Sequence, residues 1–401
     1  MVFPGRALLA AAILPLAAAF VFGAGTPPPD RYPNLFADWL GKSQLEIDAK
    51  INGAWKHFFQ GEPQYQRLYF PVSDDMAYIA DTGNEDVRTE GMSYGMMLAV
   101  QTDHKAEFDR LWKWARTHMY HAEGPRKGYF AWHCRYDGTQ IDQGSASDGE
   151  EWFIMALLFA SNRWGDGQGI FNYRAEAQAL LKAVLTDRRG EGVGSIFNLK
   201  EKQVTFVPSG PGSQFTDPSY HLPAFYELWA QWSDTDRAFW SEATKISREF
   251  FRKAAHKKTG LMPEYANYDG TPRPGYPGAF RYDAFRILHN VALDYAWWRT
   301  DPWQKEQSNR ILRFFVSQGP DFSNQYSLDG KPLGAETSVG LYAMAAAAGL
   351  AADRDVAQPF VQRLWELEPP TGKYRYYDGL LYFFGLLEVS GRFRIHEPAA
   401  K

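Results

Sequence analysis

The sequence predicts an all-α protein, an (α/α)6 barrel of about twelve helices with a small irregular β element in its loops. Past residue 30, apolar residues recur at i, i+3, i+4 and i+7, which is typical of helices with one buried face. Long connections rich in Gly, Pro, Asp and Tyr alternate with short ones. No stretch alternates apolar and polar residues well enough to indicate a central sheet.

The periodicity predicts helices over 35–59, 91–102, 105–120, 148–163, 173–186, 220–233, 236–255, 281–299, 303–317, 338–352, 355–367 and 376–390. The long connections run over 60–90, 121–147, 187–219 and 257–280. Six helical hairpins in a ring would place the starts of one set of helices at one rim, where these loops would build a groove. Within the third loop, residues 197–207 are expected to form a small hairpin.

The beginning of the chain has the pattern of an export signal. Arg6 supplies a positive charge, the run 7–22 is apolar and small residues follow it, so we expect a signal peptide over 1–25. A membrane span needs about 20 residues, which leaves an uncleaved anchor as the alternative. Residues 26–34 form a Pro-rich spacer, and 35–401 form one domain. We therefore expect an exported protein, periplasmic or secreted, without stable membrane association once the signal is cleaved.

The composition disfavours several classes of function and favours one kind of site. The net charge is −4 and no run of basic residues is present, so the chain lacks the electrostatic footprint of a nucleic-acid-binding protein. The only cysteine, Cys134, excludes an intrachain disulfide and a Cys-based metal site. His133, His221 and His289 have no metal-ligand spacing with one another. Aromatic residues make up 16% of the chain, with 14 Trp and 22 Tyr, which favours a carbohydrate cleft beside ordinary core packing.

Glu90 is the first candidate site residue. It lies in the segment 88–97 (Arg-Thr-Glu-Gly-Met-Ser-Tyr-Gly-Met-Met) at the start of a predicted helix. Gly91 and Gly95 each cost that helix about 1 kcal/mol relative to Ala. A helix start that tolerates this cost is expected to let another molecule approach its backbone closely.

Two further carboxylates, Asp148 and Asp283, also lie at predicted helix starts. Helix capping, by Asp148 or its neighbour Ser147, is the simpler explanation for each of them taken singly. The barrel, however, sends all three acids to one rim, and glycoside cleavage needs one protonated and one ionised carboxyl group. A helix N-terminus lowers a carboxyl pKa, so an acid at Glu90 would need burial or the nearby charge of Asp148 to raise it. Arg286 could keep Asp283 ionised.

Several motifs together resemble glycoside hydrolase family 8, and most of all its reducing-end xylose-releasing exo-oligoxylanases. Besides 88–97, the motifs are 81–84 (Asp-Thr-Gly-Asn), 128–132 (Gly-Tyr-Phe-Ala-Trp), 148–151 (Asp-Gly-Glu-Glu), 163–167 (Arg-Trp-Gly-Asp-Gly), 217–223 (Asp-Pro-Ser-Tyr-His-Leu-Pro), 263–266 (Pro-Glu-Tyr-Ala) and 376–378 (Tyr-Tyr-Asp). The resemblance covers about residues 30–395. It implies an (α/α)6 barrel that hydrolyses β-1,4 links with inversion and needs no metal or organic cofactor.

The resemblance also implies roles for individual residues. Glu90 matches the general acid, and Asp283 matches the base that activates water. The residues that match the substrate-binding part of the site are Asp148 at subsite −1, Tyr220 beside the water, Trp132 as a sugar platform, and Tyr282, Arg286 and Tyr377 along the cleft. The implied partner is a xylo-oligosaccharide or xylan, and the protein is expected to be a monomer.

One segment departs from the exo-acting pattern. Those members carry a loop with Leu-His-Pro before a Val-Gly-Leu stretch, whereas 334–341 reads Gly-Ala-Glu-Thr-Ser-Val-Gly-Leu, shorter and without His. An endo-β-1,4-xylanase with an open cleft is therefore an alternative, and Tyr282 agrees with endo-acting members. A related β-1,4-glucanase or chitosanase is a second alternative. A non-catalytic sugar-binding barrel is a third, which the presence of all three acids disfavours.

Overall fold

The computed structural model describes Met1 and residues 31–399. This part of the chain contains thirteen α-helices: α1 (Leu35–Leu40), α2 (Gln44–Trp55), α3 (Thr89–Gln101), α4 (Lys105–Trp114), α5 (Ser147–Trp164), α6 (Tyr173–Ala183), α7 (Pro223–Trp232), α8 (Arg237–Ala254), α9 (Arg286–Trp298), α10 (Trp303–Gln318), α11 (Val339–Ala347), α12 (Arg354–Glu366) and α13 (Arg375–Val389). Apart from Met1, the expected signal peptide lies outside the described residues, as does most of the spacer.

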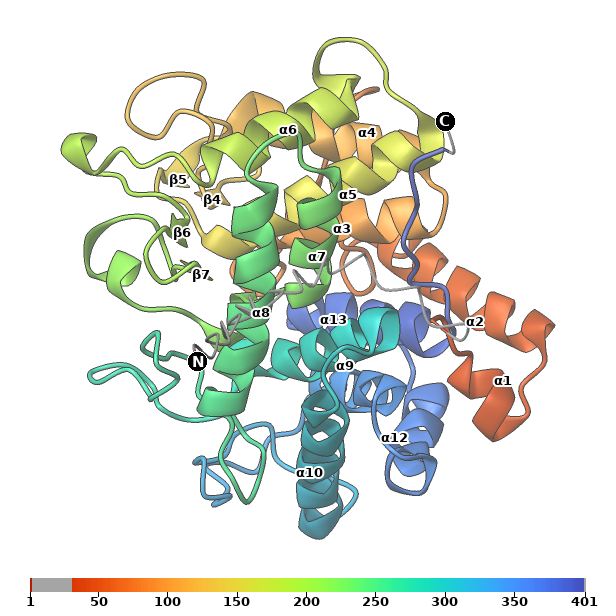
Figure 1. The fold of residues 1–401 in the computed structure, drawn as a ribbon. Helices are drawn as coiled ribbons and strands as arrows, with labels where there is room; N and C mark the ends of the chain where they lie inside the picture. Colours follow the sequence, from red (N-terminus) through yellow and green to blue (C-terminus); the bar gives the residue numbers. More distant parts are fainter. Residues whose placement is uncertain (2–30, 400–401) are drawn as a thin grey trace.

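The helices form two concentric rings, an inner ring of α3, α5, α7, α9, α11 and α13 and an outer ring of α2, α4, α6, α8, α10 and α12 (Figure 1). Around the inner ring, α13 packs against α3, α3 against α5, α7 against α9, and α11 against both α9 and α13. An edge-to-face contact between Trp152 and Phe225 joins α5 to α7. The predicted (α/α)6 barrel is confirmed.

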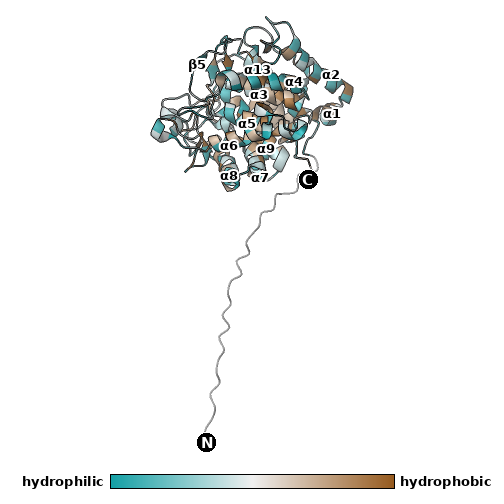
Figure 2. Ribbon diagram, turned by 90° about the horizontal axis from the view of Figure 1, so that it is seen from above, coloured by the Kyte–Doolittle hydropathy of each residue, from teal (hydrophilic) through white to brown (hydrophobic). Residues whose placement is uncertain are grey.

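Burial differs between the two rings as this arrangement requires. In the inner helix α3 every residue but Glu90 is buried. The outer helix α8 buries one stripe, which includes Trp240, Ala243 and Phe251, and leaves the rest half-buried or exposed. Figure 2 shows hydrophobic residues gathered toward the middle of the helical body and hydrophilic ones toward its periphery.

The predicted helix over 35–59 is wrong as a single element, because the chain breaks between α1 and α2. Gly41 ends α1 in the left-handed region with φ +67°, and its N–H binds the carbonyl of Ala37. Ser43 then starts α2 with a capping box, in which its side chain accepts from the N–H of Glu46 and its own N–H donates to the Glu46 carboxylate. A C-terminal Gly followed by a capping box stabilises two helices better than one.

Short antiparallel strands lie in the long loops: β1 (Tyr69–Pro71) with β2 (Ala77–Ile79); β3 (Val87–Arg88) with β4 (His133–Cys134) and β5 (Gln140–Asp142); and β6 (Phe197–Asn198) with β7 (Gln203–Val204). The last pair is the predicted hairpin. The strand pair β3–β4 matters most for function, because β3 leads directly into α3. The N–H of Thr89 donates to the carbonyl of Trp132 at 3.0 Å, which ties the two loops together beside Glu90.

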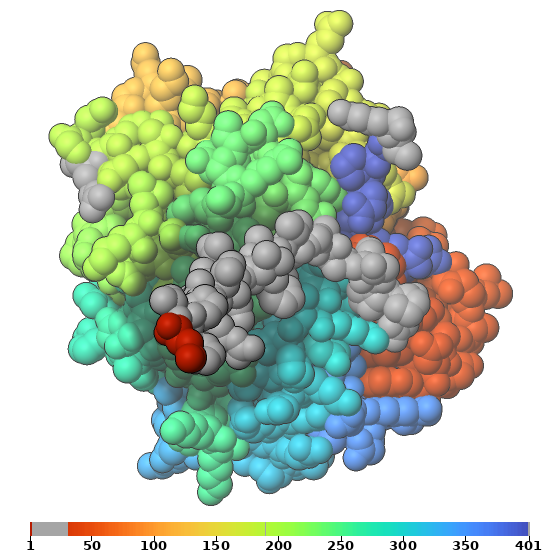
Figure 3. All heavy atoms as spheres, in the orientation of Figure 1, coloured from red at the N-terminus to blue at the C-terminus, as the bar shows by residue number. Residues whose placement is uncertain are grey.

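The two ends of the domain meet at one side of the barrel. Helix α1 packs against α12 and α2 against α13. Figure 3 shows the corresponding red-orange and blue surfaces next to each other. Among the described helices, none combines the length and the apolar character that crossing a bilayer requires.

Candidate active site

One buried guanidinium joins the three acids predicted from the sequence. Arg286, the first residue of α9, is 2% exposed. Its Nη1 lies 2.9 Å from Glu90 Oε2 and 2.9 Å from Asp148 Oδ2, and its Nη2 lies 3.0 Å from Asp283 Oδ1. The starts of α3 and α5 and the short 3₁₀ helix η7 (Tyr282–Phe285) therefore converge at one rim of the inner ring.

The three acids do not cap their helices, so the simpler explanation for their positions is wrong. Helix α5 begins at Ser147, and its N-cap residue, Ala146, has no side-chain cap. Asp148 Oδ1 accepts from the N–H of the adjacent Gly149, and its Oδ2 turns to Arg286. Helix α3 and η7 also lack side-chain caps. Since local capping does not explain these carboxylates, their contacts with Arg286 do, across the barrel for Glu90 and Asp148 and from three positions earlier in the chain for Asp283.

The expectation for Gly91 and Gly95 is also wrong in one respect. The molecules that approach these glycines closely are side chains of the protein itself. A Cβ at Gly91 would lie 2.8 Å from the Tyr376 hydroxyl oxygen, and one at Gly95 would lie 2.6 Å from Ile79 Cγ1. Gly91 thus lets the ring of Tyr376 reach the start of α3, where the Tyr376 hydroxyl donates to Glu90 Oε1 at 2.9 Å.

The electrostatics of the cluster separate Glu90 from an ordinary carboxyl group. Partial burial, which removes most of the water around the carboxyl group, raises the pKa of Glu90 to about 7; Arg286 and the Tyr376 hydrogen bond act to lower it, and the negative charges of Asp148 and Asp283 raise it. Burial also raises the pKa of Asp148, and Asp283 adds to that increase. One positive charge faces three acids, so a proton held at Glu90 near neutral pH relieves the imbalance.

Two hollows flank Glu90 and Asp283. A pocket of about 330 Å³ is lined by both acids together with Trp132, Asp148, Tyr220, Arg286, Phe206 and Tyr265. A second pocket of about 400 Å³ shares Glu90 and Asp283 and is lined by Tyr282, Tyr374, Tyr376 and Tyr377. All eight residues predicted for the site therefore border one or both hollows, and an elongated molecule could cross the two acids.

Tyr282 holds an unusual backbone conformation next to Asp283. Its φ of +39° lies in the left-handed region, which is rare for residues other than Gly. The Tyr377 hydroxyl donates to the Tyr282 carbonyl at 3.0 Å and so ties this turn to α13. Tyr282 is 44% exposed, so part of its surface is available for a ligand.

Sequence reasoning missed several side chains of the site. Tyr94, one turn after Glu90 on α3, accepts a 2.9 Å hydrogen bond from Arg286 Nη1. Tyr376 bonds Glu90, although only its neighbour Tyr377 was assigned a role. Arg88 places its guanidinium 5.5 Å from the centre of the Trp132 ring and pairs with Asp86 at 3.0 Å. The position of Tyr94 at i+4 from Glu90 was the available signal.

Outside the site, the remaining candidates have structural roles. Cys134 is buried, and burial raises the pKa of its thiol to about 12. His221 bonds Thr216 and Ser247 in the interior, and His289 pairs with Glu388 at 2.9 Å. Within residues 31–399, no group of three or more His, Cys, Asp and Glu side chains has the arrangement of a metal site.

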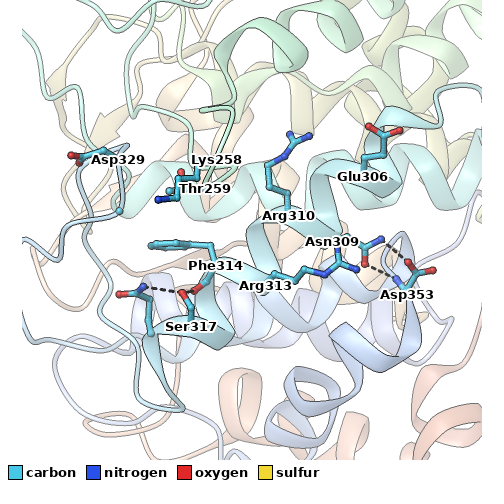
Figure 4. A pocket seen from close by; sticks show the side chains of 12 residues that line it. Lys258, Thr259, Glu306, Asn309, Arg310, Arg313, Phe314, Ser317, Asp329 and Asp353 are labelled. Carbon is cyan, nitrogen blue, oxygen red and sulfur yellow. Dashed lines mark hydrogen bonds between the residues drawn. The ribbon is translucent and has the colours of Figure 1, made fainter.

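A larger pocket of about 650 Å³ lies away from these acids, along α10 (Figure 4). Its walls mix Lys258, Arg310 and Arg313 with acidic groups, among them Asp353. Asp353 pairs with Lys305 at 2.6 Å and accepts from Asn309 at 2.9 Å. Size alone therefore does not locate the catalytic centre, because this pocket lacks the unbalanced carboxylates that flank Arg286.

The barrel of two helical rings carries three carboxylates around one arginine at its rim, with a tyrosine-lined hollow on either side. This arrangement is that of a glycoside hydrolase. The chain belongs to glycosyl hydrolases family 8, whose sequence profile matches residues 47–391. The resemblance drawn from its motifs is thereby confirmed.

Three proteins of known description are similar to this chain over most of its length. A reducing-end xylose-releasing exo-oligoxylanase of Paenibacillus barcinonensis is 49% identical over 384 residues, which cover 94% of this chain and 100% of that one. An enzyme of the same description from Halalkalibacterium halodurans is 44% identical, over 92% of this chain and 95% of its own. The structure of a Teredinibacter turnerae family 8 xylanase, a catalytic mutant in complex with xylohexaose, has a TM-score of 0.89 at 44% identity and covers 92% and 98% of the two chains.

Proposed function

We propose that the protein hydrolyses β-1,4-xylosidic bonds in xylo-oligosaccharides with inversion and releases xylose from the reducing end. The observation that carries this proposal is the pair Glu90 and Asp283, bound to different nitrogens of Arg286 between two tyrosine-lined hollows. The xylose specificity rests on the exo-oligoxylanase relatives.

Each acid has a role in this reaction. Glu90, with its raised pKa, is the general acid that protonates the departing sugar oxygen. Asp283 is the base that takes a proton from the attacking water. Inversion requires room for that water between the two carboxyl groups, which are typically about 6.5–9.5 Å apart. Their attachment to different terminal nitrogens of one guanidinium keeps the two carboxyl groups apart, which is compatible with such a separation.

The other site residues bind the sugar. Asp148, in the 330 Å³ hollow, holds the distorted sugar at subsite −1, and Tyr220 in the same hollow helps to hold the water. Trp132 supplies a flat apolar face on that side, and Tyr282 and Tyr377 supply faces on the other. The water oxygen bonds to C1 as the glycosidic C1–O bond breaks, Asp283 takes the water proton, and Glu90 gives its proton to the leaving sugar oxygen. The reaction as proposed therefore needs no cofactor.

An endo-xylanase is the second candidate, and the segment that would block the cleft favours it. All residues from 331 to 337 are exposed, and the segment lies back on residues 324–325 through hydrogen bonds from the N–H of Asn324 to the carbonyl of Glu336 and from the N–H of Leu333 to the carbonyl of Gln325. It contains no His. The similarity to the Teredinibacter turnerae xylanase supports the same alternative.

A time course on xylotetraose labelled at its reducing end separates the two modes. Reducing-end release predicts that labelled xylose appears first and alone. Early labelled xylobiose, together with a fall in the viscosity of polymeric xylan, would establish endo attack instead. Parallel assays on cellotetraose and chitosan tetramer test the glucanase and chitosanase alternatives, and absence of turnover on all substrates would overturn the proposal in favour of a sugar-binding barrel.

We also propose that the enzyme is exported and acts as a monomer. The composition of residues 1–25 supports export. Cell fractionation followed by N-terminal sequencing of the mature protein tests both export and cleavage. Recovery of the uncleaved chain in the membrane fraction would instead support an anchor, and size-exclusion chromatography with light scattering tests the monomer.

A further inference from the structure

The 3₁₀ turn η6 (Pro218–Tyr220), which presents Tyr220 to the catalytic hollow, is fixed by buried polar groups from several elements. Asp217 Oδ1 accepts from the N–H of Ser219 at 2.7 Å. Asn290 Nδ2 on α9 donates to the Ser219 carbonyl at 2.7 Å. The hydroxyl of Tyr226 on α7 lies 3.2 Å from the Tyr220 carbonyl oxygen. The position of Tyr220 therefore depends on residues that lie behind the site.

Tyr226 has a second partner, Glu151, which extends this network to α5. The Tyr226 hydroxyl contacts Glu151 Oε1 as well as the Tyr220 carbonyl. A tyrosine hydroxyl carries one hydrogen, and a backbone carbonyl only accepts. If Glu151 were ionised, it would also only accept, and one hydrogen would have to serve two acceptors. If Glu151 is protonated, it donates to Tyr226, and Tyr226 donates to Tyr220, so both contacts are satisfied.

The surroundings of Glu151 also favour the protonated form. Its side chain is fully buried, and its Oε2 meets no hydrogen-bonding group among the described residues. Asp148 and Glu150 lie on the same helix, and the nearby cation, Arg286, is already shared among three other acids. Burial raises the pKa of Glu151 well above its ordinary value; the Tyr226 hydrogen bond opposes this and the two neighbouring acids add to it.

We propose that Glu151 is a neutral carboxylic acid that positions Tyr220 through Tyr226, and thereby orders the water that Asp283 activates. This inference rests on the proposed hydrolytic function. Glu151 and Tyr226 are positioning residues, since neither lines the two hollows beside Glu90 and Asp283.

Tyr226→Phe tests the network because it removes both hydrogen bonds and keeps the ring. We expect kcat on xylotetraose to fall about tenfold, which corresponds to about 1.4 kcal/mol, with KM changed less than twofold. The matched control is Tyr129→Phe, another fully buried tyrosine, whose hydroxyl lies 3.1 Å from the carbonyl oxygen of Ala183, away from the site. The control should lose some thermal stability and keep its kcat. Equal kcat losses in both variants would overturn the proposal.

A second substrate shows whether Tyr226→Phe affects the activation of water by Asp283 or the protonation of the leaving group by Glu90. In β-xylobiosyl fluoride the water oxygen bonds to C1, its proton passes to Asp283, and the C1–F bond breaks without protonation of the leaving group. Tyr226→Phe should therefore slow the fluoride and xylotetraose by the same factor. Glu90→Gln should slow the fluoride much less than xylotetraose. A Tyr226→Phe defect confined to xylotetraose would place the effect on the acid and overturn the proposal.

Two substitutions of Glu151 test its neutral state. The Gln amide can donate to the Tyr226 hydroxyl as a protonated acid does, so Glu151→Gln should keep kcat within about twofold. Glu151→Met fills similar space without a donor and should match Tyr226→Phe. A severe loss of kcat in Glu151→Gln, with thermal unfolding unchanged, would show that the charge of Glu151 is required. Full activity in Glu151→Met would show that the hydrogen-bond network is not required. Either result would overturn the proposal. Because each comparison is made with active wild-type enzyme, an inactive wild type would refute the proposed function separately.

Discussion

Two arginines, the buried Arg286 and the largely buried Arg248, bind carboxylates in different parts of the barrel. Arg248, on the outer helix α8, binds Asp294 through two nitrogens at 2.7 and 2.8 Å and meets Glu227 at 3.2 Å. Arg286 meets three acids from three elements at 2.9 to 3.0 Å. The Arg248 cluster links neighbouring helices, whereas the Arg286 cluster opens to two hollows.

The two clusters differ in how completely the arginine binds its acid. Asp294 receives both arms of one guanidinium, a strong and specific geometry for an ionised carboxylate. Glu90 shares a single nitrogen with Asp148 and Tyr94, and its side chain remains 16% exposed. An acid that must exchange a proton needs an incomplete set of partners and access to the substrate. The same residue types thus serve structure in one place and catalysis in the other.

The largest effect is expected from removing the acid or the base at Arg286. Glu90→Gln and Asp283→Asn should keep the fold and lower kcat on xylotetraose by about 10³-fold or more, because each removes a proton-transfer group. Asp294→Asn in the other cluster should leave kcat nearly unchanged and lower the melting temperature. Steady-state kinetics and thermal unfolding of the three variants measure this contrast, and substantial turnover by Glu90→Gln would refute its assignment.

Removing the cations compares the two clusters directly. Arg286→Met and Arg248→Met each leave buried acids without their partner, a change that typically costs about 3–5 kcal/mol. Both should lower the free energy of unfolding in urea. Only Arg286→Met should also abolish turnover at temperatures where the variant remains folded. Comparable activity in the two folded variants would mean that Arg286 has only a structural role.

A smaller effect is expected from removing the charge of Asp148. The acid works when protonated, and the pKa of Glu90 is about 7, so kcat/KM should fall as pH rises through about 7. The negative charge of Asp148 raises that pKa, so Asp148→Asn should move the fall to lower pH by about one unit. Its kcat should also decrease, with a smaller change in substrate affinity. A pH–rate profile with an unmoved alkaline limb would contradict this coupling.

The smallest effect is expected from Tyr376→Phe. The Tyr376 hydrogen bond acts to lower the pKa of Glu90, so its loss should move the alkaline limb of kcat/KM upward by a fraction of a pH unit. The same measurement on Tyr382→Phe is the control. Tyr382 lies further along α13, and its hydroxyl donates to the carbonyl of Leu367, away from Glu90. A downward shift in Tyr376→Phe would reverse the assigned direction.

The sequence contains more local signals of the fold than hydrophobic periodicity alone. The hydrophobic periodicity predicted most of the helices, and the alternation of long and short loops predicted the ring. The break between α1 and α2 was also present in the sequence, in Gly41 and in the Ser43–Glu46 pair of a capping box. Apolar periodicity across that stretch outweighed these two signals, although both act within one helical turn.

The site could be predicted in part. Positions at predicted helix starts singled out Glu90, Asp148 and Asp283 and predicted a common rim, and the family resemblance assigned their roles. The role of Arg286 as their shared partner could not be predicted from spacing, because Arg286 and Glu90 are separated by 196 positions. Tyr376 was missed for the same reason, since its contact with Glu90 spans 286 positions and depends on the space that Gly91 leaves.

The sequence by itself determined the helices, their order around the ring and the acids at one rim, because periodicity and helix starts are local properties. Only the tertiary structure decided which acid keeps a proton. That outcome depends on burial and on distances between charges on α3, α5 and η7, and the chain sets these distances only when the ring closes.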